Sequence, residues 1–386
     1  MNRFPNRLVI FSGVSHHRLD EKIIAHRGFV REVDIWARIF DEVLVVSRLV
    51  SGPAAADAVP YAEKNIHQHF LSGPHNTDGL SGKLQLAFAG PAWLFESLRL
   101  LRKADILMAR GPDSIGFLGW LVSRFTSLSR FAKYADQWEN FPNEPLGYRL
   151  QKIFYRSATF GGPVMIYGAA DEHYPHWVPF FTSGVSRAEW EAAGQSIVGR
   201  RHPPPYRLLF AGRLVYFKGA DVLLQAMKHL QDEGLPVLLD LVGDGPERGK
   251  LESLVSEYGL RNVTLHGWLG SQALAERYAN AHIFVHPSRK EGFGKVLVEA
   301  MSYGLPIVGA DVGVSRELVQ KNQCGVLFQS ENVFELAASI KCLMASPDLM
   351  RAFSNNGRQV SQEMLLESLE SRYLDFAANR LFYSHG

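Results

Sequence analysis

The stretch RLLFAGRLVYFKGADVLLQAMKHLQDEGLPVLLDLVGDG, residues 207–245, decides the fold of this 386-residue chain. Its two ends carry short apolar runs rich in β-forming residues, at 207–212 and 237–242, and the segment 220–230 between them repeats its apolar residues at helical spacing. A strand, a helix and a second strand in this order make the repeating unit of a parallel sheet covered by helices. These residues therefore predict a Rossmann-like domain.

The same alternation organises the rest of the chain. In the C-terminal half, further strands are expected at 262–268, 282–288 and 306–311, and further helices at 247–259, 271–281 and 295–304. In the N-terminal half, strands are expected at 7–14, 42–49, 105–111, 130–136 and 163–169, and a helical stretch at 21–40. The pattern predicts an α/β protein of two doubly wound parallel-sheet domains.

The segment 194–205 predicts the link between the two domains. Its glycine and three consecutive prolines cannot continue a helix or a strand and favour an extended linker. We therefore expect an N-terminal domain at 1–193, a C-terminal domain at 206–364, and a helical segment at 365–386 that could pack back on the first domain. Open α/β sheets bind ligands at the carboxyl ends of their strands, so we expect the chemistry in a cleft between the two domains.

Composition and charge exclude several classes of protein. The formal net charge of +2 is too small for the concentrated basic surface that nucleic acids demand. The only two cysteines, Cys324 and Cys342, supply neither a disulfide framework nor a zinc cluster. The apolar run at 7–14 is expected to be a buried strand and not a signal peptide, and no uncharged stretch approaches the roughly 20 residues that span a bilayer. We expect a cytoplasmic protein, with any contact with the inner face of the membrane being peripheral.

The most specific local feature is Glu291-Gly-Phe-Gly-Lys-Val-Leu-Val-Glu299, which follows a predicted strand and opens a helix. Gly292 and Gly294 allow a ligand to approach the backbone, and the free amides and positive dipole end of the helix favour an anion such as a diphosphate. Glu299 lies off the apolar stripe of the helix, free to reach the hydroxyls of a ribose. The alternative is that Glu291 occupies a surface turn and that Glu299 is a solvated residue paired with Lys295.

A second feature is the turn Gly212–Gly219, in which two cations, Arg213 and Lys218, flank one strand-to-helix connection. Arginine offers a planar fork and lysine a point charge, so the two can neutralise a diphosphate and the charge that builds on it as a leaving group. Either residue alone could be an ordinary solubilising loop residue. Their coincidence with the acidic segment in one domain favours a binding site.

A third loop, Gly243-Asp-Gly-Pro246, ends the predicted strand 237–242. Its glycines could bring the backbone against a nucleotide, but the same four residues also make a good turn. Both interpretations stay open.

Taken together, residues from about Tyr206 to Met344 resemble the retaining glycosyltransferases of family GT4, which have the GT-B fold. The resemblance rests on the order and spacing of the GRL…KG turn, the VGDGP loop, the His266-Gly267 element and the run EGFGKVLVEAMSYGLPIV. It implies transfer of a glycosyl group from a UDP- or GDP-linked sugar to a saccharide or glycolipid acceptor, with retention of configuration. It also implies that no metal or other cofactor is needed, because arginine and lysine take the role of Mg²⁺.

The resemblance also assigns roles to individual residues. Glu291 and Glu299 would contact the donor sugar and the ribose, and Arg213 and Lys218 the phosphates. With Asp136, the residues Arg213, Lys218 and Glu291 form the expected catalytic set. The remaining donor-binding positions that it implies are Gly13, Gly243, Gly245, Gly267, Trp268, Gly292, Phe293, Gly294, Lys295, Val296 and Leu297.

The N-terminal half matches the family only in outline. Members often have a Gly-rich loop after the first strand, whereas this chain has a single Gly13 followed by His16 and His17. The two histidines could bind phosphate or the acceptor, but we expect them to be solvated or helix-capping loop residues and do not expect this pair alone to bind a metal. The family's usual Asn-Gly-Val-Asp is Ser183-Gly-Val-Ser186 here. Asp136, after a middle strand, is the candidate for facing the sugar, and the alternative is that it caps the following segment.

The stretch 117–134 mixes aromatic residues with Arg124, Arg130 and Lys133 and could form a surface that contacts an anionic membrane leaflet. A buried helix followed by a strand explains the same apolar residues. Both interpretations stay open.

Three rival functions also follow from the sequence. A sugar-nucleotide epimerase of the same fold would act on the donor alone, and a catalytically silent GT-B protein would bind a donor without turnover. An NAD-dependent enzyme is disfavoured because no Gly-x-Gly-x-x-Gly with an acid at the expected distance follows the first strand of either domain.

Overall fold

The chain forms two compact units in the computed structural model, which describes residues 3–71, 79–138, 140–141, 144–168, 171–197 and 203–382, with the backbone alone for 79–89 and 158. Unit 1 comprises Met1–Phe180 and Glu370–Gly386, and unit 2 comprises Phe181–Leu369. The chain therefore changes units ahead of the segment 194–205 that the sequence indicates as the linker, and part of that segment lies outside the described residues.

Unit 1 is built on a mixed sheet. Its described strands are β1 (Phe4–Leu19), β2 (Lys22–His26), β3 (Phe40–Leu49), β4 (Ala58–Pro60), β5 (Ile66–Phe70), β6 (Ile106–Gly111), β7 (Ser129–Tyr134), β8 (Val164–Tyr167) and β9 (Trp177–Phe180). Parallel pairing gives the order β5-β3-β1-β6-β7-β8-β9, and β2 pairs antiparallel with the last residues of β1 and with β4. The strand order reverses between β1 and β6, as in a doubly wound sheet.

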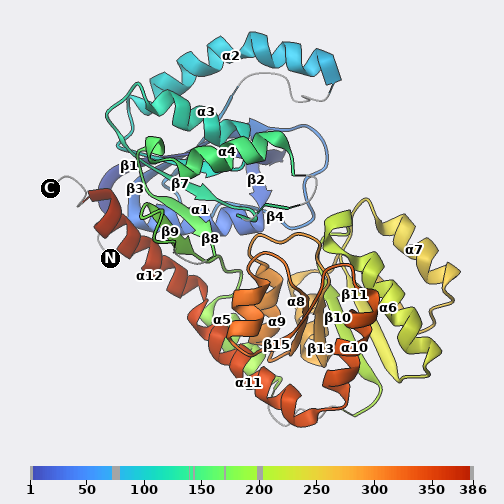
Figure 1. Cartoon of the computed structure of the whole chain (residues 1–386). Helices are drawn as coiled ribbons and strands as arrows, with labels where there is room; N and C mark the ends of the chain where they lie inside the picture. The colour runs from blue at the N-terminus through green and yellow to red at the C-terminus, as the bar shows by residue number, and fades with distance from the viewer. Residues whose placement is uncertain are drawn as a thin grey trace. The chain divides into compact units, whose positions relative to one another are not determined.

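Helices cover both faces of this sheet (Figure 1). They are α1 (Arg27–Ile39), α2 (Gly79–Leu101), α3 (Ser114–Ser123), α4 (Leu146–Arg156) and the last part of α12 (Leu366–Phe376). Alternate residues of β1, Val9 and Phe11, join the buried cluster beneath α2 and α3. On the opposite face, the ring of Trp36 from α1 packs against Phe131 of β7, with centroids 5.5 Å apart.

The start of unit 1 corrects one prediction. Residues 21–40 are predicted as one helical stretch, but Lys22–His26 form β2 and the helix begins only at Arg27. β1 continues to Leu19, and the chain reverses at Asp20, which has a φ of 53°. His26 then caps α1 by accepting a hydrogen bond from the amide of Gly28 at 3.2 Å. The apolar residues of the segment serve first a strand and then a helix, which a single helical pattern cannot show.

The C-terminal residues are an integral part of unit 1. Tyr373, fully buried, stacks on Trp36 with ring centroids 4.1 Å apart. Phe376 packs against Phe131 at 5.2 Å, and Glu370 pairs with Arg38 at 2.8 Å. Each buried aromatic side chain removes roughly 150–250 Å² from water, so these residues complete the apolar core on this face of the sheet.

Unit 2 is built on a parallel sheet of order β12-β11-β10-β13-β14-β15. Its strands are β10 (Tyr206–Ala211), β11 (Val237–Val242), β12 (Val263–Gly267), β13 (Ile283–His286), β14 (Ile307–Ala310) and β15 (Gly325–Phe328). Its helices are α5 (Arg187–Gln195), α6 (Ala220–Asp232), α7 (Arg248–Glu257), α8 (Ser271–Asn280), α9 (Lys295–Ser302), α10 (Val333–Met344) and α11 (Pro347–Glu363). The strands and helices predicted between 207 and 311 are confirmed, and β15, α10 and α11 lie beyond the predicted pattern.

The middle of this sheet is buried on both faces. Leu208 and Leu209 are consecutive in β10, point to opposite faces, and are both fully buried. Helices therefore cover both faces of the sheet. The loops at the carboxyl ends of the strands are left as the place where a ligand can bind. The strand order reverses between β10 and β13, which places the loops after these two strands side by side.

Candidate functional site

The loops after β10 and β13 bring together the two turns that the sequence singles out. Lys218, at the end of a short 3-10 turn (Tyr216–Lys218), forms an ion pair and hydrogen bond with the carboxylate of Glu291. The same Glu291 oxygen lies 2.9 Å from Nε2 of His286, the last residue of β13. Ser288 Oγ lies 3.2 Å from that nitrogen. The predicted acid and cation are therefore in direct contact at the switch point of the sheet.

Glu291 is held as a carboxylate in a confined place. Its side chain is only 12% exposed, so the interpretation of it as a surface-turn residue is wrong. Burial alone would raise its pKa, but the charge of Lys218 and the hydrogen bond from His286 outweigh that cost and hold the pKa well below its ordinary value. The site therefore keeps a buried negative charge next to an ammonium group at neutral pH.

A glycine allows this contact. Gly219 follows Lys218 with a φ of 67°, and a Cβ atom at this position would lie 2.0 Å from the carbonyl oxygen of Pro287. Only glycine fits both the left-handed backbone and the close approach. The approach presses the turn after β10 onto the loop after β13.

Arg289 fixes the same turn from the other side, and the sequence reasoning missed it. Its guanidinium makes two hydrogen bonds to Asp221, at 2.8 and 2.9 Å, and lies 4.1 Å from the centre of the Tyr216 ring. It also donates to the carbonyl of Tyr216 at 2.6 Å, and its amide donates to Phe217 at 2.8 Å. A basic residue three positions after a strand gives no sign of this role in the sequence. Arg289 positions the turn that carries Lys218.

Arg213 has a different environment from Lys218. It is exposed, and its guanidinium makes no hydrogen bond or ion pair with any of the residues that the structure describes. It follows β10 directly, on the same connection as Lys218. This connection therefore presents one guanidinium free to take an anion.

The loop after β11 supports the turn after β10. The amide of Leu214 donates to the carbonyl of Asp244 at 2.9 Å. A Cβ atom on Gly243, whose φ is 140°, would lie 1.8 Å from the carbonyl oxygen of Gly212. Gly245 approaches the carbonyl of Leu214 in the same way. The glycines of this loop thus have a packing role.

The segment from Glu291 to Glu299 forms a turn followed by α9. Gly292 and Phe293 make the turn, and Phe293 is buried, whereas Lys295 and Val296 are half-buried at the first turn of the helix. Gly294 is the N-cap, and the amide of Leu297 donates to its carbonyl at 2.8 Å. The apolar stripe predicted for this helix, Leu297, Ala300, Met301 and Gly304, is buried.

Glu299 is half-buried and held by other residues of unit 2. One carboxylate oxygen accepts a hydrogen bond from the hydroxyl of Tyr278 at 3.0 Å. Burial, together with the charge of Glu299, raises the pKa of Tyr278 well above its ordinary value, so this hydroxyl stays a donor. The other oxygen lies 3.0 Å from where a Cβ atom on Gly184 would be.

The departure at Ser183–Ser186 proves conservative in its local geometry. Ser186 is the N-cap of α5 and forms a capping box with Glu189. The hydroxyl of Ser183 accepts a hydrogen bond from the amide of Val185 at 3.2 Å. Serine and aspartate are among the preferred N-cap residues, so the change keeps the helix start.

Two further predicted positions lie at the end of β12. Gly267 is its last residue, and its carbonyl accepts a hydrogen bond from the amide of Gly243 at 2.8 Å. Trp268 follows and is 46% exposed. The neighbouring His266 bonds to Asp240 at 2.7 Å within the sheet.

In unit 1, Gly13 lies within β1 and not in a loop. Its amide donates to the carboxylate of Asp113 at 2.9 Å, and the same carboxylate caps α3 by accepting from Gly116 at 2.6 Å. Asp113 thus joins the middle of β1 to the start of α3. The amide of Gly13 is engaged within unit 1.

His16 corrects another expectation. It lies in β1, fully buried, with hydrogen bonds to Tyr61 at 2.6 Å and to Ser47 at 2.8 Å. Burial lowers its pKa to about 4, so it is neutral. It is neither solvated nor a helix cap, because partners distant in sequence enclose it. His17, also in β1, lies next to the carbonyl of Gly52 at 3.3 Å.

Asp136 lies two residues beyond the carboxyl end of β7 and is half-buried. One carboxylate oxygen accepts from the amide of Gln137 at 2.7 Å. The next helix, α4, begins ten residues later at Leu146, so Asp136 is not a helix cap. The position at a strand end remains compatible with contact to a ligand.

The stretch 117–134 is divided between α3 and β7. Trp120 and Val122 of α3 and Phe131 of β7 are buried, as the alternative interpretation expects, whereas Phe125 is 76% exposed. No helix among the described residues is long and apolar enough to cross a membrane. The same residues hold no group of three or more His, Cys, Asp or Glu side chains arranged for a metal ion.

Comparison with known proteins agrees with this geometry. Residues 198–360 match the family model described as glycosyl transferases group 1. A D-inositol 3-phosphate glycosyltransferase from Xylanimonas cellulosilytica is 32% identical over 173 residues, which are 44% of this chain and 42% of the relative. The match thus spans less than half the length of that protein.

Solved structures resemble nearly the whole chain. Sucrose-phosphate synthase from Thermosynechococcus elongatus has a TM-score of 0.71 at 20% identity, over 97% of this chain and 98% of that one. Anabaena HepE, in complex with UDP and glucose, has a TM-score of 0.68 at 17% identity, over 97% and 100%. At these identities the likeness establishes the fold, which is GT-B.

Proposed function

Since residues 198–360 belong to the glycosyl transferases group 1 family and the fold is GT-B, we propose that the chain transfers a sugar from a nucleoside diphosphate sugar to an acceptor with retention of configuration. One observation carries the proposal. Lys218 and Glu291 meet at the switch point of the unit 2 sheet, with the unpaired Arg213 on the same connection. This is where open α/β sheets bind nucleotides.

The proposed donor site divides its tasks among these residues. Arg213 and Lys218 bind the diphosphate, and the positive end of α9 adds to the field. Glu291 contacts the donor sugar, and Glu299, oriented by Tyr278, accepts hydrogen bonds from the ribose hydroxyls. Hydrogen bonds from hydroxyls to a fixed carboxylate are charge-assisted and give the nucleoside its orientation.

The proposed chemistry follows from where charge develops. As the glycosidic bond to the diphosphate breaks, negative charge grows on the leaving phosphate, next to Arg213 and Lys218. The carboxylate of Glu291 lies beside Lys218 and can stabilise positive charge at the sugar. In this proposal the two cations fill the role that a divalent metal fills in other transferases.

The donor nucleotide is tested by thermal unfolding of the full chain with UDP, GDP, ADP and their common sugars. The cognate nucleotide at about 100 times its Kd stabilises by about 2.7 kcal/mol, which raises Tm by about 5–10 °C. Arg213→Ala and Glu299→Ala are expected to remove most of this shift. Arg261→Ala is the matched control, because Arg261 is exposed at the opposite edge of the sheet, before β12.

The reaction is tested with the nucleotide sugar identified in this way. Product analysis by mass spectrometry with acceptor mixtures is expected to show sugar transfer only when an acceptor is present. An epimerised sugar formed from the donor alone would instead establish the epimerase. Stabilisation by a nucleotide without turnover would establish a silent binding protein, and no shift with any nucleotide would refute the donor site.

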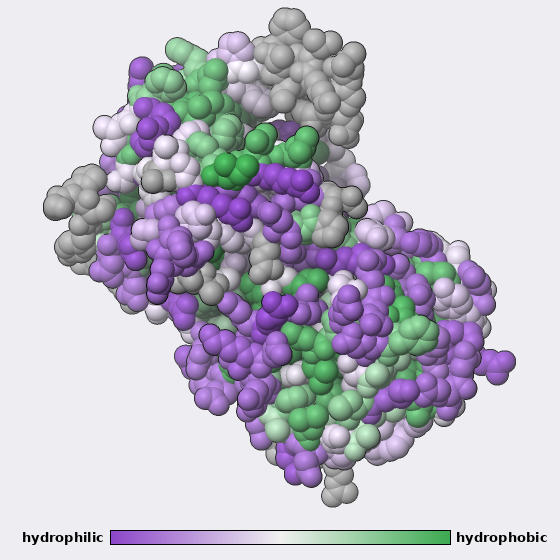
Figure 2. All heavy atoms as spheres, viewed as in Figure 1, coloured by the Kyte–Doolittle hydropathy of each residue, from purple (hydrophilic) through white to green (hydrophobic). Residues whose placement is uncertain are grey.

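We further propose that the acceptor is lipid-linked and that α4 contacts an anionic membrane surface. Leu146, Leu150 and Ile153 repeat at i, i+4 and i+7 on one face of α4 and are 75%, 65% and 63% exposed. Figure 2 shows hydrophobic side chains gathered where α4 lies in Figure 1, with hydrophilic ones beside them. Arg149, on the same helix, is half exposed. An apolar face with a nearby cation is typical of interfacial helices.

Sedimentation with phosphatidylglycerol and phosphatidylcholine vesicles tests this contact. The wild type is expected to sediment with the anionic vesicles, and Leu150→Gln with Ile153→Gln to abolish it. Phe334→Gln, which changes a 72% exposed residue of unit 2, is the control. Equal sedimentation of the double variant and the control would refute a role for α4.

A further inference from the structure

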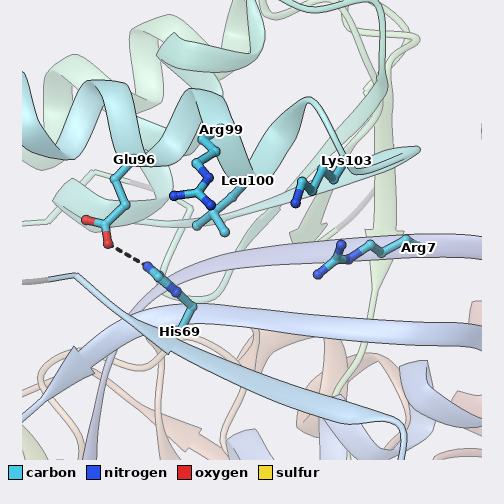
Figure 3. Close-up of a pocket in the computed structure, with 6 residues that line it drawn as sticks. All are labelled: Arg7, His69, Glu96, Arg99, Leu100 and Lys103. Carbon is cyan, nitrogen blue, oxygen red and sulfur yellow. Dashed lines mark hydrogen bonds and ion pairs between the residues drawn. The ribbon is translucent and has the colours of Figure 1, made fainter.

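A pocket of about 290 Å³ lies in unit 1 between the last turns of α2 and the strands β1 and β5 (Figure 3). Three of its six lining residues are cationic and one is acidic. The six are Arg7, His69, Glu96, Arg99, Leu100 and Lys103. The acidic residue, Glu96, is engaged with His69, its carboxylate 2.7 Å from Nε2. The pocket therefore has an excess of positive charge.

Two of the cations stand close together without a carboxylate. Arg99 lies in the last turn of α2, Lys103 lies two residues after the helix ends, and Figure 3 shows both side chains extending toward the pocket. Like charges that lie close together repel each other. Neither side chain forms an ion pair or hydrogen bond within the described part of the chain. An anion between them would turn this repulsion into attraction.

Arg7 supplies a third cation from the strand side. One terminal nitrogen pairs with Glu42 at 3.1 Å, and Figure 3 shows the guanidinium extending into the pocket. Its Nε is shielded from solvent and has no hydrogen-bond partner among the described residues. A buried donor left unsatisfied costs roughly 1–3 kcal/mol. Because Nε is shielded, an anion in the pocket would be met by the terminal nitrogens of Arg7, whose side chain is 25% exposed.

We propose that this pocket binds a phosphate group. Two guanidinium groups, from α2 and β1, and one ammonium group from the turn after α2 match the several oxygens and the charge of a phosphate ester. The phosphate can be that of a small soluble ester or of a phospholipid headgroup. The exposed Phe95, one turn before Arg99 on α2, would suit the second source, since an apolar side chain beside cations favours a membrane interface.

The pocket is separate from the residues assigned to sugar transfer. Leu8 of β1 is level with Ile106 of β6, which is level with Ser129 of β7. β7 runs from Ser129 to Tyr134, about 17 Å at about 3.3 Å per residue, and Asp136 follows its carboxyl end. Arg7 therefore lies near the amino ends of the parallel strands of unit 1, whereas Asp136 lies at their carboxyl ends. The inference does not depend on the proposed function.

Calorimetric titration of the full chain with inorganic phosphate and with glycerol 3-phosphate, at constant ionic strength, tests the pocket. Lys103→Gln and Arg99→Gln are each expected to weaken binding about tenfold, because each removes a charge-assisted hydrogen bond. Arg102→Gln is the matched control, since Arg102 is exposed on the same turn and does not line the pocket. Arg213→Ala, in the proposed donor site, is expected to leave this binding unchanged.

The two sources of phosphate give different outcomes. Sedimentation with phosphatidylglycerol vesicles that falls in Lys103→Gln, but not in Arg102→Gln, would identify the headgroup as the ligand. Saturable binding of the soluble phosphates with vesicle binding insensitive to Lys103 would identify a soluble ester. The proposal is wrong if Lys103→Gln and Arg102→Gln bind both soluble phosphates equally, or if only Arg213→Ala reduces the binding.

Discussion

Replacing Lys218 with methionine separates the two tasks that the structure gives to this residue. Its ammonium group is the charged partner of Glu291, and the two side chains are only 20% and 12% exposed. Removing one partner of a buried ion pair costs about 3–5 kcal/mol, because the other charge is left uncompensated. Glu291 keeps its contact with His286 at 2.9 Å, so we expect the lower end, about 3 kcal/mol. For a domain of 150–250 residues this lowers Tm by about 6–12 °C.

The same substitution removes a cation from the proposed leaving-group site. Loss of one preorganised donor at a developing negative charge costs about 10²–10³ in kcat. Because this interaction strengthens in the transition state, KM for the donor is expected to change much less than kcat.

The double variant Lys218→Met/Glu291→Gln distinguishes stability from catalysis. With the carboxylate neutralised, unfolding measured by scanning calorimetry is expected to return to within about 1 kcal/mol of Glu291→Gln alone. The value of kcat is expected to stay low. If the double variant regains wild-type kcat, Lys218 acts only by holding Glu291, and if Lys218→Met keeps both native Tm and native kcat, the reasoning about this pair is refuted.

Three further predictions concern neighbouring residues. The folded-state pKa of Glu291 lies below its ordinary value of 4.5, so the ionised carboxylate stabilises the fold above that pH and this stabilisation is lost as the pH falls below it. The Tm of the wild type is therefore expected to fall more steeply than that of Glu291→Gln between about pH 6 and about pH 3. Parallel curves of Tm against pH for the two proteins would contradict this prediction. Arg289→Lys keeps the positive charge but loses the bidentate hydrogen bond with Asp221, so the Kd of the nucleotide is expected to rise about tenfold. An unchanged Kd would show that Arg289 does not position the residues that bind the nucleotide. Gly184→Ala places a Cβ atom 3.0 Å from a Glu299 oxygen and is expected to weaken nucleotide binding with Tm unchanged; retention of full affinity would show that Glu299 has room to move.

The fold of unit 2 and the meeting of its two turns could be predicted because both follow from local pattern and chain order. Alternating strands and helices predict a parallel sheet, and the loops that leave adjacent strands at a switch point must lie together. His286 and Arg289 could not be found in this way. His286 stands in an apolar strand as an ordinary core histidine does. Arg289 acquires its role from partners far back in the sequence, such as Asp221, 68 residues earlier.

Unit 1 was harder to predict because its special residues depend on distant partners. His16 is enclosed by Ser47 and Tyr61, which are 31 and 45 residues away. The local sequence shows two histidines after a glycine. It cannot distinguish a loop from a strand that continues and is buried by residues distant in sequence. The local sequence likewise cannot predict that Tyr373 packs on Trp36 in the core of unit 1, although the spacing of its apolar residues predicts a helix.

The two departures from the family pattern therefore have different weight. At Ser183–Ser186 a different residue caps the start of α5, and Gly184 still lies beside Glu299 of the proposed donor site. At Gly13 the backbone amide already donates a hydrogen bond to Asp113. The chain continues as a strand at this position, so it lacks the free backbone amides that a Gly-rich loop would offer. An anionic group of a ligand bound at this end of unit 1 would thus have to be met by side chains and not by backbone amides at this position. In the proposed transfer, side chains of unit 1 would therefore select the acceptor.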